Sequence, residues 1–201
     1  MSRLTLGAKP TVLRCARCGR FVDREAAQVQ TVCGCRPRLN LPEVLLRQAV
    51  PEDAENTQTL FRREIGRATV TAFGEELTIG DHPAIVAEMK GELAGVLAYR
   101  LQADALHVVA LATDPIWQWS GVASHLVAEA EFIARRHGMK RLVYATTNDN
   151  LPALYFCQRR GWTLSEVVPG ARIPPGGAAG GVGFAGIPVR DEIRLAKALG
   201  D

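Results

Sequence analysis

Residues 105–137 constrain the fold most, because an apolar run there gives way to a short turn and then to a helical pattern. The run Ala105–Thr113 is rich in β-branched residues and short enough to form a strand. Asp114 and Pro115 end it, since proline cannot donate to a sheet ladder. The helical pattern that follows spans about four turns and ends at Gly138, a residue suited to the helix C-cap. A strand, a glycine-containing turn and a helix N-terminus in this order predict an anion site, where unpaired N–H groups and the positive end of the helix dipole meet.

The turn carries neither G-x-G-x-x-G nor G-x-x-x-x-G-K-[ST], the two common motifs that bind nucleotide phosphates. It reads Q-x-x-G-x-A, from Gln118 through Gly121 to Ala123. This pattern resembles the acyl-CoA loop of the GNAT N-acetyltransferase superfamily, which has Arg or Gln, two residues, Gly, one residue, and then Gly or Ala.

A second match lies downstream, at the distance that the family requires. The family pattern is Asn, two residues, Ala, three residues, usually Tyr, three residues, Gly and an aromatic residue. Asn150, Ala153, Gly161 and Trp162 fit this pattern, whereas Cys157 stands where the tyrosine usually is. With two ordered motifs, the chain is identified as a member of the GNAT superfamily.

The resemblance covers roughly residues 43–201 and implies an α+β fold. In the GNAT fold a mixed, mostly antiparallel sheet is flanked by helices, and CoA inserts where the fourth and fifth strands splay apart. The sequence agrees in element order, with Gly91-Glu92 as a two-residue hairpin turn. We expect strands at 43–50, 84–90, 93–100, 105–113, 141–147 and 190–199, another strand that begins after 161–162, and helices at 51–63, 122–137 and 151–160.

Four of the five cysteines cluster near the N-terminus, in Cys-x-x-Cys-Gly and Cys-x-Cys patterns. Four thiolates at such spacing suit tetrahedral zinc, and a short segment with few large apolar residues needs such a staple to fold. The alternatives are four unrelated reduced thiols or a disulfide formed on oxidation. We therefore predict a zinc-binding module at 1–42, followed by the acetyltransferase domain at 43–201, with a structural zinc held by Cys15, Cys18, Cys33 and Cys35.

Composition limits the classes of partner. A net charge of +3 is too small to indicate nucleic-acid binding, and no apolar run approaches the roughly 18 residues of a membrane span. The first residues lack the features of a signal peptide. We expect a cytoplasmic protein that acts on a small-molecule or peptide amine, with a homodimer left open as its assembly.

The resemblance also implies how acetyl-CoA, the co-substrate, is held. Main-chain groups of Leu111 and Thr113 would bind the pantetheine arm and the acetyl carbonyl. Asn150 would hydrogen-bond the arm, or act as the N-cap of the next helix, and the two roles are compatible. The pyrophosphate would bind backbone N–H groups of the turn formed by Gln118, Trp119, Ser120, Gly121, Val122 and Ala123.

Two side chains are candidates for proton transfer. His107 precedes Leu111 by four residues, which places both on the same strand face, and its ordinary pKa of ~6.5 suits a base that deprotonates the amine. Its alternative is a purely structural histidine. Cys157, at the position of the family's tyrosine, would protonate the leaving thiolate, or it is a small packing residue while water delivers the proton.

The glycine-rich stretch 170–187 cannot form regular structure without a large entropic cost. It is a plain linker, or a lid beside the acetyl group. The activity predicted from the sequence is acetyl transfer from acetyl-CoA to an amine by direct attack in a ternary complex. Transfer of a longer acyl group, or a non-catalytic CoA-binding or zinc-mediated interaction protein, are the alternatives.

Overall fold

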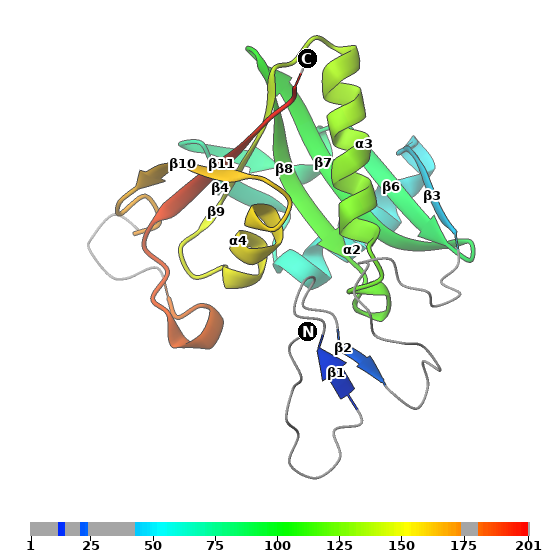
Figure 1. Cartoon of the computed structure of the whole chain (residues 1–201), viewed down its shortest axis with the longest axis horizontal. Coiled ribbons are helices and arrows are strands. Elements are labelled where there is room, and N and C mark those ends of the chain that lie inside the picture. The colour runs from blue at the N-terminus through cyan, green and yellow to red at the C-terminus, as the bar shows by residue number, and fades with distance from the viewer. Residues whose placement is uncertain (1–11, 15–20, 24–42, 174–180, 201) are drawn as a thin grey trace, which may run out of the picture.

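The computed structural model describes residues 12–14, 21–23, 43–173 and 181–200. A seven-stranded sheet in the order β10-β11-β9-β8-β7-β6-β3 forms the centre, with α3 on one face and α2 on the other (Figure 1). The strands of this sheet are β3 (Val44–Gln48), β6 (Ala84–Met89), β7 (Glu92–Gln102), β8 (Ala105–Thr113), β9 (Arg141–Thr147), β10 (Thr163–Val168) and β11 (Glu192–Ala198).

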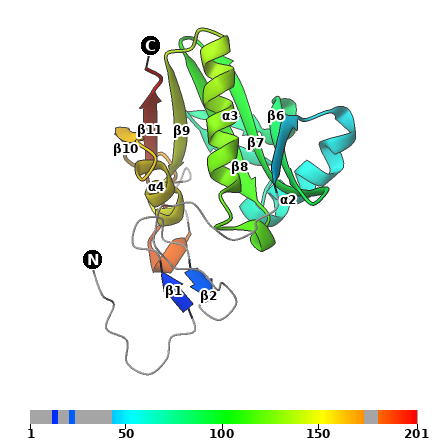
Figure 2. The same ribbon diagram turned by 45° about the vertical axis from the view of Figure 1, so that its right-hand side comes forward.

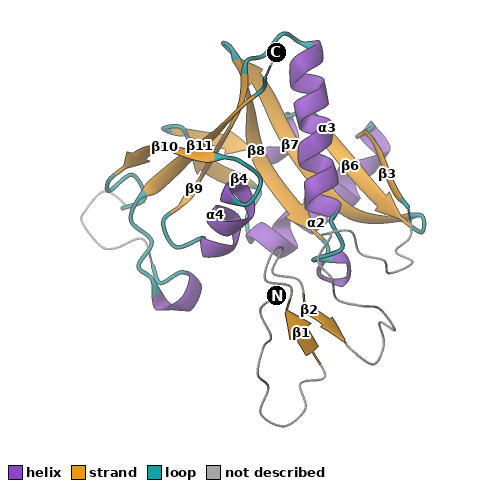
Figure 3. Ribbon diagram, in the orientation of Figure 1, coloured by secondary structure: helices purple, strands orange, loops and turns teal. Residues whose placement is uncertain are grey.

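Three α-helices, four short 3-10 helices and two small hairpins accompany this sheet in the described part of the chain (Figure 3). The α-helices are α2 (Ala54–Ile65), α3 (Val122–Arg136) and α4 (Leu151–Gln158). The hairpins are β1 (Val12–Arg14) with β2 (Phe21–Asp23), and β4 (Thr69–Ala72) with β5 (Glu75–Thr78). In the central sheet β8 and β9 are parallel and the other neighbours are antiparallel, which confirms the expected mixed, mostly antiparallel sheet.

Each face of the sheet has its own apolar core. Ile85 and Leu126 belong to the core under α3, whereas Val86 and Phe61 belong to the core under α2. Ile85 and Val86 are neighbours on β6, and successive strand residues point to opposite faces. Figure 2 shows α3 standing against one face, with α4 beside β9.

The strand–turn–helix segment expected at 105–137 is confirmed. β8 ends at Thr113, a short 3-10 turn spans Pro115–Trp117, and α3 follows at once. Gly138 has a φ of +69° just beyond the end of α3, in the left-handed conformation that favours glycine after a helix.

The hairpin between β6 and β7 corrects one expectation. Its two turn residues are Lys90 and Gly91, with φ of +55° and +78°, while Glu92 already pairs with Met89. Both turn positions need a left-handed backbone, so the glycine takes the second one rather than the first. The β4–β5 hairpin has a similar turn at Phe73-Gly74, and the sequence analysis did not anticipate it.

Several predictions from the sequence lie outside the described residues. These are the four zinc ligands Cys15, Cys18, Cys33 and Cys35, and residues 174–180 of the glycine-rich stretch. Among the described residues no cluster of His, Cys, Asp and Glu is arranged to hold a metal ion. No helix in that same part of the chain is long and apolar enough to cross a membrane.

Candidate active site

The split between β8 and β9 is the central feature of the site. The two strands pair in parallel only from Ala105 with Arg141 up to Val108 with Tyr144. Among the residues that the structure describes, 109–113 of β8 have no partner on β9, while 145–147 of β9 stay paired with β11. The expected splay of the fourth and fifth strands is therefore present.

A β-bulge on β8 marks the point where the split begins. Tyr99 of β7 pairs with Val108 and Ala98 pairs with Ala110, so Val109 is an extra residue on β8. Val109 and Ala110 both pack into the core under α2, which two successive residues of a regular strand would not do.

Main-chain groups of β8 face the split beyond the bulge. The N–H of Asp114 donates to the carbonyl of Ala94 on β7 at 2.9 Å. Strand N–H and C=O groups alternate between the two edges, so those of Thr113 and Leu111 point away from β7. These are the two residues that the resemblance assigns to the cofactor arm, and their backbone faces the side from which β9 has separated.

The turn before α3 is the place where the sequence predicts an anion site. Gly121 is the N-cap with a φ of +101°, and the N–H groups of Val122 and Ala123 have no acceptor within the helix. Two other N–H groups are used inside the turn, since Gln118 donates to Pro115 and Ser120 donates to Trp117. The positive end of the helix is therefore available at its first residues rather than along the whole of 118–123.

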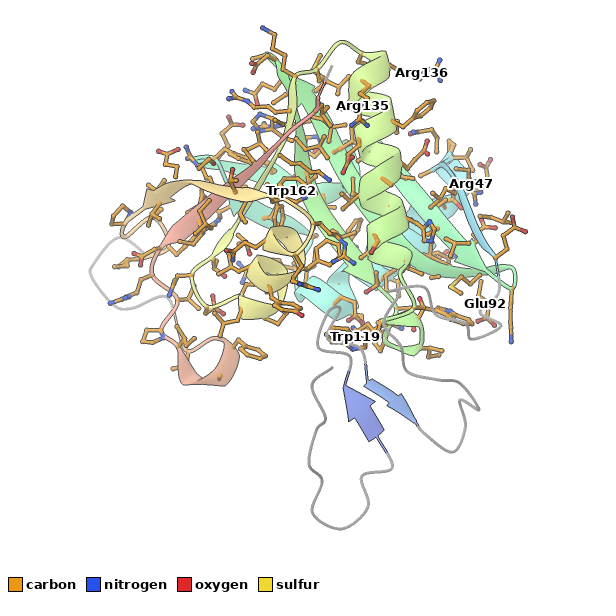
Figure 4. The ribbon with its side chains drawn as sticks, viewed as in Figure 1. Arg47, Glu92, Trp119, Arg135, Arg136 and Trp162 are labelled. Carbon is orange, nitrogen blue, oxygen red and sulfur yellow. The ribbon has the colours of Figure 1, made fainter. Side chains whose placement is uncertain are left out.

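The side chains of the turn differ in their surroundings. Val122 is buried under the helix, so only its backbone can reach a ligand. Trp119 has a φ of +66° and a side chain that is 53% exposed, and Figure 4 shows it at the N-terminal end of α3. Gln118 is exposed, and Ser120 donates its hydroxyl hydrogen to the Trp117 carbonyl at 2.5 Å.

Two arginine side chains connect the turn to neighbouring helices, and neither was predicted from the sequence. Arg160 at the end of α4 donates from Nε to the Ser124 hydroxyl on the first turn of α3 at 3.0 Å, and its guanidinium stacks on Phe156. Arg63 of α2 pairs with Asp114 at 2.8 Å, which holds the pKa of that carboxyl below its usual range. Arg160 thus joins α3 to α4 and adds positive charge beside the helix N-terminus.

Asn150 is the N-cap of α4. Its side-chain oxygen accepts from the Ala153 N–H at 3.2 Å, and its amide donates to the Thr146 hydroxyl at 3.0 Å. The capping role expected from the sequence is therefore confirmed, and both polar ends of the side chain already have protein partners.

Cys157 faces the core rather than solvent. Its side chain is 4% exposed and belongs to the core under α3. Burial raises the pKa of its thiol to about 12, so it is protonated at neutral pH. Burial likewise raises the pKa of Tyr144, on the neighbouring strand, to about 12.

His107 lies on the other face of the sheet, and the expectation that it shares a face with Leu111 is wrong. Its ring packs edge-on against Phe73 at 4.5 Å, on the α2 side, whereas Leu111 packs against the core under α3. The extra residue Val109 between them reverses the alternation. Burial, followed by the charge of Arg100, lowers the pKa of His107, so its imidazole is neutral at pH 7.

The structure thus gathers most of the candidates around one opening. The α3 turn, the backbone of Leu111 and Thr113, and α4 with Asn150 and Cys157 border the face that carries α3, while His107 lies on the opposite face. A hollow lined by Val50, Thr57 and His82 lies beside α2 and shares no residue with the split.

Comparisons with known proteins agree with this geometry. A sequence model of the Acetyltransferase (GNAT) family matches residues 51–162. YxbD, an uncharacterized protein of Bacillus subtilis (strain 168), is 30% identical over an alignment of 117 residues. The match covers 54% of this chain and 69% of that protein.

Solved structures share the fold. The IAA acetyltransferase from Bacillus cereus ATCC 14579 aligns with a TM-score of 0.61 and 20% identity, over 78% of this chain and 100% of its own. An acetyltransferase from Bacillus subtilis in complex with CoA aligns with a TM-score of 0.59 and 19% identity, over 79% of this chain and 99% of its own. The match of the family model, together with the split sheet and the α3 turn, shows that the chain belongs to the GNAT acetyltransferase family.

Proposed function

We propose that the protein transfers an acetyl group from acetyl-CoA to an amine acceptor, by direct attack of the amine in a ternary complex. The observation that carries this proposal is the separation of β8 from β9 after Val108 and Tyr144, next to a helix N-terminus with unpaired N–H groups. A thioester arm that enters the split meets backbone groups of Leu111 and Thr113.

The cofactor's pyrophosphate would bind at the first residues of α3. The N–H groups of Gly121, Val122 and Ala123 and the helix dipole favour anionic oxygens there. Arg160 strengthens the positive potential, since its guanidinium contacts Ser124 on the same helical turn.

The reaction forms one bond and breaks another. The neutral amine nitrogen attacks the thioester carbonyl carbon and the C–N bond forms; as the C–S bond breaks, the nitrogen releases one proton to solvent and the leaving thiolate takes one up. An alkyl amine with a pKa near ~10.4 is mostly protonated at neutral pH, so a base must remove its proton before attack. If the cofactor enters beside α3, the acceptor approaches from the opposite face of the sheet. His107 lies on that face and is neutral, so it is the candidate base.

Cys157 is a poor proton donor for the leaving thiolate, which takes up its proton from the solvent instead. Burial raises the pKa of the Cys157 thiol to about 12, above the ~8.5 of an ordinary thiol, so transfer of its proton to the leaving thiolate is unfavourable. The packing interpretation of Cys157 therefore has the stronger physical support. Because Cys157 stands where the family usually has a tyrosine, a second candidate function remains. In it, the protein binds CoA without transferase activity, or it transfers a longer acyl chain.

A transfer assay with two matched variants tests the proposal. Purified protein with acetyl-CoA and a panel of amines should release free CoA and give acetylated amine by mass spectrometry, in equal amounts. Gly121→Glu should abolish both acetyl-CoA binding and release, because it adds negative charge beside the phosphate site. Gly121→Ala is the control, since any side chain at a φ of +101° brings the same backbone strain without the charge.

The outcomes separate the candidate functions. Binding of acetyl-CoA without turnover on any amine would favour the non-catalytic function, and turnover with longer acyl-CoA only would change the donor. Equal loss of binding in Gly121→Ala and Gly121→Glu would contradict the placement of the pyrophosphate.

The N-terminal cysteines support a structural zinc that takes no part in the transfer. Four thiolates, from Cys15, Cys18, Cys33 and Cys35, match the donor set and charge of tetrahedral structural sites. Metal analysis of protein purified without chelator should give about one zinc per chain, and Cys18→Ser should lose it. Metal-free protein in which residues 1–42 stay folded would overturn this assignment.

A further inference from the structure

A buried ionic cluster lies on the sheet face opposite α3. Its centre is Glu192 on β11, whose side chain is only 2% exposed. Glu192 accepts from the Phe73 backbone N–H at 3.1 Å, from Arg172 at 2.9 Å and from Nε of Arg194 at 2.7 Å. The other two donors hold the carboxylate of Glu192, and the bond to that carboxylate holds the side chain of Arg172, which belongs to the irregular segment after β10.

The cluster borders the split strands. Glu192 pairs with Thr147 on β9, beyond the last β9 residue that pairs with β8. Its neighbour Ile193 packs against the core under α3, so the side chain of Glu192 points to the opposite face. The turn at Phe73 contacts His107 of β8 as well as Glu192 of β11, and thus bridges the two sides of the split on that face.

Several buried guanidinium N–H groups in this neighbourhood lack an acceptor, although Arg100 also pairs with Glu75 and Arg194 with Glu166, each at 2.7 Å. Nε of Arg172, and Nε and one terminal nitrogen of Arg100, are buried and have no hydrogen-bond partner among the described residues. Arg100 and Arg194 both lie over the ring of Phe73, at 5.9 and 5.6 Å. Burial and the charges of Arg67 and Arg194 lower the pKa of Arg172, while Glu192 opposes the change.

A bound anion would supply the hydrogen-bond acceptor that these buried N–H groups lack. A buried donor that lacks an acceptor loses its hydration without compensation, and the loss is larger for a charged group. A guanidinium held by one carboxylate is well placed to donate its remaining N–H groups to another carboxylate.

We propose that Arg172, anchored by Glu192, binds a carboxylate of the acceptor, so that the substrates are amines that carry a carboxylate group. This inference rests on the proposed function, because it places the acceptor on the face opposite α3. Arg172 is then a residue that determines specificity, and Glu192 is a positioning residue.

The test compares matched acceptors in full-length protein. The specificity ratio is kcat/KM for an amino acid divided by kcat/KM for its carboxamide, measured in the wild type and in Arg172→Gln. Because both proteins act on the same two amines, differences in amine basicity cancel. Loss of a charged hydrogen bond should lower the ratio by about 10- to 100-fold, with little change for the carboxamide.

Two further variants guard the interpretation. Arg190→Gln makes the same charge change in the same region of the chain, on a side chain that is 57% exposed, and should leave the ratio unchanged. Arg172→Gln could fold poorly because the buried Glu192 loses one of its three donors. The double variant Arg172→Gln/Glu192→Gln removes both charges and should show the same low specificity ratio. An equal loss of activity on both acceptors would show that the ion pair is only structural, and would overturn the proposal.

A binding measurement separates this inference from the transferase activity. Acetate is added to ¹⁵N-labelled protein at constant ionic strength, and the Nε–H resonance of Arg172 is followed, assigned by its absence in Arg172→Lys. A saturable shift supports the carboxylate site even if no amine is acetylated. A resonance that does not move would overturn the proposal even if amines are acetylated.

Discussion

Gly95 on β7 gives the sharpest prediction about how the sheet positions α3. Gly95 pairs with Thr113, beside the split, and lies under the first turn of α3. A Cβ at this position would lie 2.7 Å from Cγ1 of Val122, 3.1 Å from Cδ1 of Leu126 and 3.1 Å from the backbone carbonyl oxygen of Ala112. Gly95→Ala should therefore push the first turn of α3 away from the sheet.

The size of the effect follows from the packing. Overpacking of one methyl group costs about 1–3 kcal/mol of unfolding free energy. Displacement of the first turn should also weaken at least one hydrogen bond to the cofactor's phosphates, worth about 1.5–3 kcal/mol, so the Kd for CoA should rise about 10- to 100-fold.

A double-mutant cycle with Val122→Ala tests the cause. Val122→Ala removes the methyl group that would lie nearest, so Gly95→Ala should cost about 1 kcal/mol less in that background, while the contacts with Leu126 and the Ala112 carbonyl remain. Urea denaturation and calorimetric titration of CoA measure both quantities. Gly80→Ala is the control, since its Cβ would meet only the flexible end of Gln58, at 3.4 Å. Equal costs of Gly95→Ala in the two backgrounds would refute the reasoning.

Three other predictions concern single side chains. Cys157→Ala should lower stability by about 1–2 kcal/mol in a denaturation series but leave the rate per folded molecule within about twofold, whereas a loss of about 100-fold would assign it the proton transfer. Burial lowers the pKa of His107 in the folded state, so its contribution to stability is full above about pH 6.5 and is lost as the pH falls toward the lowered pKa. The free energy of unfolding should therefore fall less steeply between about pH 7 and 5 in His107→Gln than in the wild type. Equal slopes in the two proteins would contradict this. A Cβ at Gly183 would collide with the Asp149 carboxylate, so Gly183→Ala should lose about 1–3 kcal/mol in thermal unfolding, with the loss relieved in an Asp149→Ala background and the idea rejected if it is not.

The sequence predicted those parts of the site that depend on local pattern. The strand, turn and helix from Ala105 to Arg136 follow from apolar periodicity and from Pro115, and the cap at Asn150 follows from its place before α4. These features need only the chemistry of nearby residues, so one sequence suffices.

The face of His107 could not be predicted in this way. Its orientation depends on the bulge at Val109, and a bulge is set by pairing with β7 rather than by the sequence of β8 alone. Glu192 is similar, because two of the three donors that allow its burial are distant in the sequence: Phe73 lies 119 residues away, and Arg172 lies in an irregular segment. Long-range pairing of charges leaves no periodic signal in the sequence.

A crystal structure of the full-length protein with CoA is the most direct test of the central claim. It should show the pyrophosphate within hydrogen-bond distance of the N–H groups at Gly121, Val122 and Ala123, with the pantetheine arm between β8 and β9 and bonded to the backbone of Leu111 and Thr113. A pyrophosphate bound away from the first turn of α3, or an arm that stays outside the split, would contradict the account.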